Sequence, residues 1–209
     1  MRKRLPKFSD KSKICIICEG KEEYQYLLRL KALNVWHDQY NISLVDAGGS
    51  GNISAIYQDK YQTGAFKIVF IFCDTEKVPY EQYEGIKRRI NEFHGVGNAA
   101  DEVIIFGNPC TLQIIIKHWT DTKIITPEKT SNARLIEKHT GVKNYDGRER
   151  QIESIMKHIT LDNYRKMSVR VKGLSQDDSV IGNSNFGKLI ELLGRDNCDW
   201  IDEINNKIG

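Results

Sequence analysis

The stretch KICIICEGKEEYQYLLRL, residues 13–30, joins a strand pattern, a glutamate and a helix pattern within one short segment. Its first six residues are almost continuously apolar, which is typical of a strand buried on both faces of a parallel sheet. Glu19 and Gly20 follow, and from Tyr24 onward apolar residues recur at helical spacing. In an open α/β sheet, ligands bind at the carboxyl ends of the strands. Glu19 is therefore a candidate functional residue.

The alternation of strand and helix patterns continues to about residue 120. Further strands are expected at residues 42–45, 67–74 and 102–107, and helices at 21–33, 53–57 and 80–93. Asn108 and Pro109 are expected to begin the next helix, with Asn as the cap and Pro in the first helical position. This pattern predicts a layered, Rossmann-like α/β fold with a mainly parallel sheet.

Beyond residue 120 the pattern becomes mostly helical. Helices are expected at residues 132–139, 148–159, 185–193 and 200–208. We therefore divide the chain into a basic N-terminal arm (1–12), an α/β domain (13–120) and a mostly helical C-terminal extension (121–209).

Composition favours an intracellular globular protein. The chain has 209 residues, 40% hydrophobic and 28% charged, and its apolar runs are far shorter than the roughly 20 residues of a membrane span. No signal-peptide core follows the basic start. Five scattered cysteines do not form a disulfide framework, and Cys15 and Cys18 are expected to be buried thiols. We expect a reducing, cytoplasmic location.

Charge is unevenly distributed. The net charge is +3, but residues 1–13 alone carry +5, which leaves −2 for the rest. Such an arm is either a nucleic-acid contact or a solvated tail.

Three acidic residues follow predicted strands. Glu19 ends the first strand, and Asp74 and Glu76 end the strand at 67–74. If these strands are neighbours, the carboxylates meet at one edge and repel one another unless a cation joins them. Oxygen ligands of this kind suit Mg²⁺ or Mn²⁺, whose open positions phosphate oxygens commonly fill. The acids therefore indicate a metal site for phosphodiester substrates.

Three segments resemble, in the same order, the signature of the TOPRIM family: CEGKEE at 18–23, DAGGSGN at 46–52 and FCDTE at 72–76. TOPRIM domains carry a glutamate after the first strand and a D-x-D pair after the third. They bind Mg²⁺ in topoisomerases, primases, OLD-type nucleases and the ribonuclease that matures 5S ribosomal RNA. The resemblance implies that Glu19 is the catalytic glutamate and that Asp74 and Glu76 are the acidic pair. Glu76 departs from the pattern, since it is one methylene longer than Asp.

A narrower resemblance covers FGNPCTLQIIIKHW, residues 106–119, which is similar to the NPC-containing segment of RloB-like proteins. These are small TOPRIM proteins associated with restriction and anti-phage islands. The acid usual in that segment is replaced here by Gln113. His118, in the same segment, is expected to be a packed histidine rather than a general base.

Several residues are candidate nucleic-acid contacts. A glycine-rich loop ahead of a helix can cradle a phosphate through its backbone amides, or it can be a tight turn. Lys21 can contact a scissile phosphate as a point charge, or it can be an exposed lysine in the first turn of its helix. The cluster Lys87–Arg89 is expected to be the outward face of its helix. A basic run near the C-terminus is either a contact to the nucleic-acid backbone or a solvated strand or loop. The remaining candidates are Gly48, Gly49, Ser50, Gly51 and Asn52 in the loop, and Arg165, Lys166, Arg170 and Lys172 in the basic run.

Together these features predict a Mg²⁺- or Mn²⁺-dependent nuclease of TOPRIM type that acts in anti-phage defence. Glu19 and Lys21 are its expected catalytic residues, and Glu19, Asp74 and Glu76 its metal ligands. RNA, including tRNA, is favoured over DNA, with an ATPase or other defence protein as a partner and homo-oligomers allowed. The alternative is a weakly active or inactive TOPRIM module that binds a nucleic acid or a partner protein.

Overall fold

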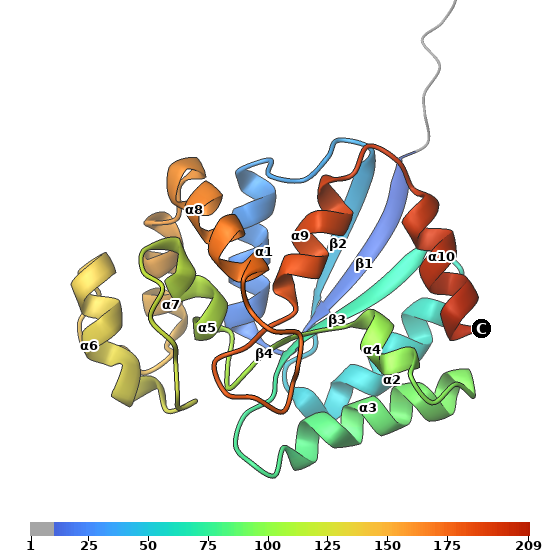
Figure 1. Cartoon of the computed structure of the whole chain (residues 1–209), viewed down its shortest axis with the longest axis horizontal. Helices are drawn as coiled ribbons and strands as arrows, with labels where there is room; N and C mark the ends of the chain where they lie inside the picture. The colour runs from blue at the N-terminus through green and yellow to red at the C-terminus, as the bar shows by residue number, and fades with distance from the viewer. Residues whose placement is uncertain (1–10) are drawn as a thin grey trace, which may run out of the picture.

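The computed structural model describes residues 11–209 and has an α/β fold with a four-stranded, all-parallel sheet (Figure 1). The strands are β1 (Ser12–Cys18), β2 (Tyr40–Asp46), β3 (Ile68–Asp74) and β4 (Ile104–Gly107), and their order in the sheet is β2-β1-β3-β4. The predicted layered fold is confirmed. The predicted arm at 1–12 falls almost entirely outside the described residues.

The register places the carboxyl ends of all four strands at one edge. Cys18 pairs with Asp46 on one side and with Phe72 on the other, and Asp74 pairs with Gly107. Because β1 and β3 are direct neighbours, residues that follow them emerge side by side.

Helices lie on both faces of the sheet (Figure 1). Their bounds are α1 (Lys21–Ala32), α2 (Ser50–Gln62), α3 (Glu81–His94), α4 (Ala99–Val103), α5 (Leu112–Ile115), a 3-10 helix (Ile116–His118), α6 (Lys129–Thr140), α7 (Glu149–Lys157), α8 (Leu161–Lys172), α9 (Phe186–Gly194) and α10 (Asp199–Ile208).

The two faces are filled by different aromatic contacts. On one face, Phe186 of α9 packs against Phe72, with ring centroids 5.4 Å apart, and Trp200 of α10 stacks on Phe70 at 6.0 Å. Phe70 and Phe72 point to the same face because strand side chains alternate. On the other face, Tyr83 of α3 lies 6.3 Å from Phe106, which pairs in register with Cys73.

The C-terminal residues are therefore part of the same core as the sheet. Buried residues from β1 to α10 form one continuous cluster, which crosses the boundary that we placed near residue 120. The extension at 121–209 is mostly helical, as predicted, but two of its helices, α9 and α10, cover the sheet.

Three local predictions were wrong or incomplete. The basic run at 165–172 lies in helix α8, because Met167 and Val171 form a buried stripe one turn apart. Asn108 does not cap a helix, and α5 begins only at Leu112; the Asn108 side chain instead donates to the Asp178 carbonyl at 2.7 Å. The short helix α4 was not predicted.

Cys15 and Cys18 are buried free thiols, as expected. Within residues 11–209, no helix combines the length and the apolar character needed to cross a membrane.

Candidate active site at the carboxyl edge of the sheet

Glu19 and Asp74 are joined directly across the neighbouring strands β1 and β3. The backbone N–H of Asp74 donates to Oε2 of Glu19 at 3.0 Å. Both side chains are half-buried. These two acids therefore lie together at one edge of the sheet, where they are expected from the sequence.

Thr111 orients the side chain of Asp74. Its backbone N–H and its hydroxyl both donate to Oδ1 of Asp74, at 2.7 and 2.8 Å. Gly107 makes this approach possible, because a Cβ at that position would lie only 2.9 Å from the carbonyl carbon of Cys110. Oδ2 of Asp74 accepts no hydrogen bond within residues 11–209.

Two further carboxylates are buried beside this pair. Glu22 and Glu23, in the first turn of α1, are each only 5% exposed. Oε2 of Glu23 accepts the N–H of Gly20 at 3.0 Å. Glu22 is covered by Lys129 of α6 and by the segment around Tyr145.

A half-buried lysine and a buried tyrosine bind Glu22. The Tyr145 hydroxyl donates to Oε2 of Glu22 at 2.7 Å, and the ammonium of Lys129 forms an ion pair with the same oxygen. Oε1 of Glu22 is buried without a hydrogen-bond partner among the described residues. Although burial acts against the charged ammonium, Glu22, Asp74 and Glu23 raise the pKa of Lys129.

The carboxylates share a strained electrostatic environment. Burial, followed by repulsion from Glu22, raises the pKa of Glu23 from 4.5 to about 7. Burial, with Glu23 and Glu19 as neighbours, raises the pKa of Asp74 well above its usual value. Burial also raises the pKa of Glu19, against the opposing effect of the Asp74 amide. Negative charge in this cluster is therefore costly without a cation.

Glu76 lies at the rim of this cluster rather than inside it. It is exposed, has a left-handed backbone with φ of 59°, and donates its N–H to the Pro109 carbonyl at 2.9 Å. It lines a hollow of about 500 Å³ that also includes Lys77 and Glu128, which form an ion pair with each other.

The glycine-rich loop lies against Glu19. The N–H of Gly49, whose φ of 129° favours glycine, donates to the Glu19 carbonyl at 2.8 Å. Lys21 is exposed and pairs with Asp46 at 3.0 Å. Ser50, Gly51 and Asn52 form the first turn of α2.

The basic residues of α8 are not joined to the carboxylates by any hydrogen bond or ion pair in the described chain. Arg170 donates to the Lys117 carbonyl at 2.6 Å, and Arg165 pairs with Asp162 at 3.8 Å. Lys166 and Lys172 are exposed.

His118 is a packed histidine, as expected. It is buried and hydrogen-bonded to the Tyr26 hydroxyl at 3.1 Å and to Asn163 at 2.9 Å, and burial lowers its pKa to about 4.

The donor chemistry of the site fits a hard divalent cation, although a complete ligand set is not formed by protein alone. Over residues 11–209, no three His, Cys, Asp or Glu side chains are grouped to hold a metal ion. Two half-buried carboxylates lie at the ends of adjacent strands, and each has one oxygen that accepts no hydrogen bond within residues 11–209. They match the one or two acidic ligands that Mg²⁺ usually takes.

Sequence reasoning missed four residues at this site: Glu22, Glu23, Thr111 and Lys129. The spacing of Glu22 and Glu23 three and four residues after Glu19 was an available signal, since it places all three at one helix start. Nothing local to Lys129 marks it.

No protein-family model, curated protein or solved structure matched this chain when it was compared with known proteins.

Proposed function

We propose that this chain is a divalent-metal-dependent nuclease of TOPRIM type, with RNA, including tRNA, favoured over DNA as substrate. The observation that carries the proposal is the direct hydrogen bond between the Asp74 backbone and the Glu19 carboxylate within a buried acidic cluster. Sites that perform acid–base chemistry concentrate such raised pKa values. The resemblance of the three segments to TOPRIM proteins supports the same function, and a place in anti-phage defence rests on the RloB-like segment alone.

Glu19 and Asp74 would hold the cation, with Glu76 as the third acid at the rim. A bound Mg²⁺ or Mn²⁺ neutralises charge that develops on a phosphoryl group and lowers the pKa of its water. Oε2 of Glu19 is engaged by the Asp74 amide, so Oε1 is the atom that would hold or release a proton. Thr111 orients Asp74, and Lys129 offsets part of the negative charge.

The test is cleavage of a mixed pool of cellular RNA and plasmid DNA with Mg²⁺ or Mn²⁺. Glu19→Gln, Asp74→Asn or EDTA should reduce cleavage by about a hundredfold or more, because each removes stabilisation of transition-state charge. Glu203→Gln, an exposed carboxylate on α10 that lines neither hollow of the site, is the matched control and should cleave as the wild type does. Binding of Mn²⁺, followed by isothermal titration calorimetry, should be lost in Asp74→Asn.

The second candidate is a binding module without catalysis. Exposure of Glu76 at the rim favours it, because the third acid is not assembled with the other two. Metal-independent nucleic-acid binding, unchanged in Glu19→Gln and without cleavage under any metal or added ATPase partner, would favour this module over the nuclease. Glu76→Asp separates the nuclease from the binding module further. The shorter side chain restores the D-x-D pattern and should raise cleavage activity only if the chain is a nuclease.

A further inference from the structure

The hollow beside Glu76 continues into a second one. The first hollow, of about 500 Å³, begins at Thr75 and Glu76, directly after Asp74. The second, of about 370 Å³, lies between the start of α2 and helix α3. Glu81 and Gln82 line both, so the two hollows adjoin, and we treat them together as one groove that leads away from the acidic cluster. We call it the α2–α3 groove.

The far end of the α2–α3 groove is basic. Arg88 and Arg89 line it together with Ser50 and Gly51. Both arginines are exposed, and the ion pair of Arg88, with Glu92, is long at 3.9 Å. Within residues 11–209, no ion pair engages Arg89.

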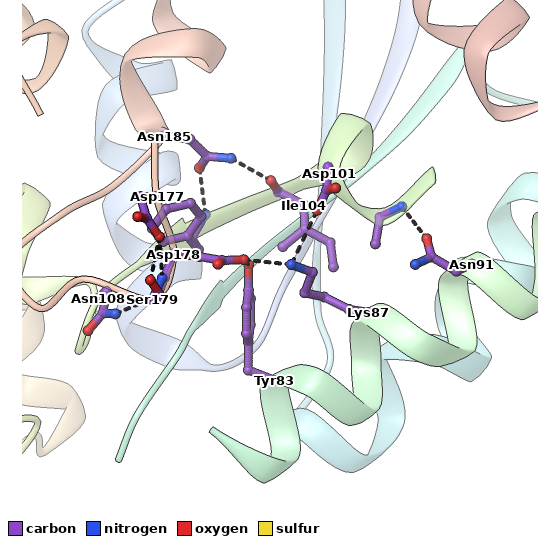
Figure 2. Close-up of polar contacts among 12 residues, drawn as sticks. Tyr83, Lys87, Asn91, Asp101, Ile104, Asn108, Asp177, Asp178, Ser179 and Asn185 are labelled. Atoms are coloured by element: carbon purple, nitrogen blue, oxygen red, sulfur yellow. Dashed lines mark hydrogen bonds and ion pairs between the residues drawn. The ribbon is translucent and has the colours of Figure 1, made fainter. Parts of the chain in front are cut away.

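Lys87, which precedes these arginines on α3, forms ion pairs with two aspartates of the protein. Figure 2 shows its ammonium directed at Asp178, at 2.7 Å, and a second pair with Asp101 is 3.2 Å long. Tyr83 also donates to Asp178, at 2.9 Å. These contacts hold α3 against the segment that precedes α9. Only the arginines of the Lys87–Arg89 cluster therefore remain for a ligand.

Both walls of the α2–α3 groove are fixed relative to the carboxylates. The wall at α2 is held by the hydrogen bond from Gly49 to the Glu19 carbonyl, at 2.8 Å. The wall at α3 is held through Asp178, and Ser50 donates directly to the side chain of Gln82 across the groove. The spacing between the acidic and basic ends is thus set before any ligand binds, as a binding site requires.

Another basic hollow of the structure is less suited to an anion. It is lined by Lys172, Lys188 and Arg195, among others. Lys188 pairs with Glu102 at 3.1 Å and Arg195 with Glu191 at 2.7 Å. Two of its three cations are thus already neutralised.

We propose that a nucleic-acid strand lies along the α2–α3 groove, with its reacting phosphate at Glu19 and Asp74 and a neighbouring phosphate at Arg88 and Arg89. This inference rests on the proposed function for the position of the reacting phosphate, but not for the binding itself. Arginine guanidinium groups bind phosphate oxygens in a bidentate manner, which suits a groove that opens between two fixed walls. The ligand class is a polynucleotide backbone, since the basic groups at the far end of the groove are arginines suited to phosphate oxygens.

The test uses the full chain and fluorescent single-stranded oligonucleotides of about 12 nucleotides, as RNA and as DNA, in EDTA, so that binding is measured without cleavage. In Arg88→Gln/Arg89→Gln, affinity at about 0.1 M salt should fall roughly tenfold, and the slope of log K against log salt should decrease by about 1.4, for two lost phosphate contacts. Arg88→Lys/Arg89→Lys should retain the slope, because both charges remain. Lys138→Gln/Lys143→Gln, two exposed charges at the end of α6 and just beyond it, is the matched control and should bind as the wild type does.

A small phosphodiester separates this inference from the nuclease proposal. Bis(p-nitrophenyl) phosphate occupies the acidic end only, so its metal-dependent hydrolysis should be lost in Asp74→Asn and unchanged in Arg88→Gln/Arg89→Gln. If oligonucleotide binding depends on the arginines while no variant or wild type hydrolyses any substrate, the groove is supported and the nuclease is not. Oligonucleotide affinity and salt slope equal to wild type in the double arginine variant, or no binding by wild type, would overturn the α2–α3 groove as a strand site.

Discussion

Replacing Glu23 by Gln should make the folded chain more stable at neutral and alkaline pH, although it removes a hydrogen-bonded acid. Burial and the adjacent Glu22 raise the pKa of Glu23 from 4.5 to about 7. At about 1.4 kcal/mol for each pKa unit, this shift corresponds to about 3 kcal/mol. Gln is nearly isosteric and can still accept the N–H of Gly20 through its amide oxygen.

The sign follows from where the proton is bound. Between pH 4.5 and about 7 the folded carboxyl keeps its proton while the unfolded one loses it. The free energy of unfolding of the wild type therefore falls as the pH rises through this window, and the loss is complete above the folded pKa. Glu23→Gln has no proton to lose there. The difference in unfolding free energy, variant minus wild type, should rise by about 3 kcal/mol across the window.

The assay is urea unfolding followed by far-UV circular dichroism, in EDTA, from about pH 4 to about pH 8. Glu137→Gln, an exposed carboxylate on α6, controls for the loss of one acid. Saturating Mg²⁺ should reduce the difference at high pH, since a cation among the acids offsets their repulsion. A difference that stays constant within about 0.5 kcal/mol over the whole range would refute the view that this carboxylate is held in a costly environment.

Three further outcomes are expected from the same unfolding assay. Burial lowers the pKa of His118 from 6.5 to about 4, so the wild type should lose about 3 kcal/mol as the pH falls through that window, and His118→Asn should not show this loss. Lys129→Met should cost about 2 kcal/mol by leaving Glu22 buried without its cation, and adding Glu22→Gln should restore most of the stability; no recovery would contradict the pairing. Gly107→Ala should lower the free energy of unfolding by about 2 kcal/mol, because its Cβ would lie 2.9 Å from the backbone of Cys110. The same variant should lower any metal-dependent cleavage in a separate activity assay. Gly194→Ala, whose Cβ would have no atom within 4 Å, is the control and should be nearly neutral.

Local pattern determined much of the fold. The apolar runs that became β1 and β3 are long enough, and separated by clear enough helix patterns, to predict a parallel sheet. Because parallel strands end at one edge, the sequence places Glu19 and Asp74 at the same edge of the sheet. That β1 and β3 are direct neighbours, which brings the two acids together, was decided by the tertiary structure. Helix α8 also left a local signal, the buried pair Met167 and Val171, which its many charges obscured.

Tertiary structure decided which side chains surround those acids. Lys129 reaches Glu22 across 107 positions of the sequence, and Thr111 reaches Asp74 across 37. Asn108 resembled a helix cap but satisfies the carbonyl of Asp178, 70 residues away. Hydrophobic periodicity predicts which face of a helix or strand is buried. It does not predict which polar group from a distant part of the sequence contacts that face in the folded chain. The alternation of strands and helices, and the edge at which the acids lie, are thus properties of the sequence. The burial of Glu22, by contrast, arises only when α6 and the segment around Tyr145 pack against it in the folded chain.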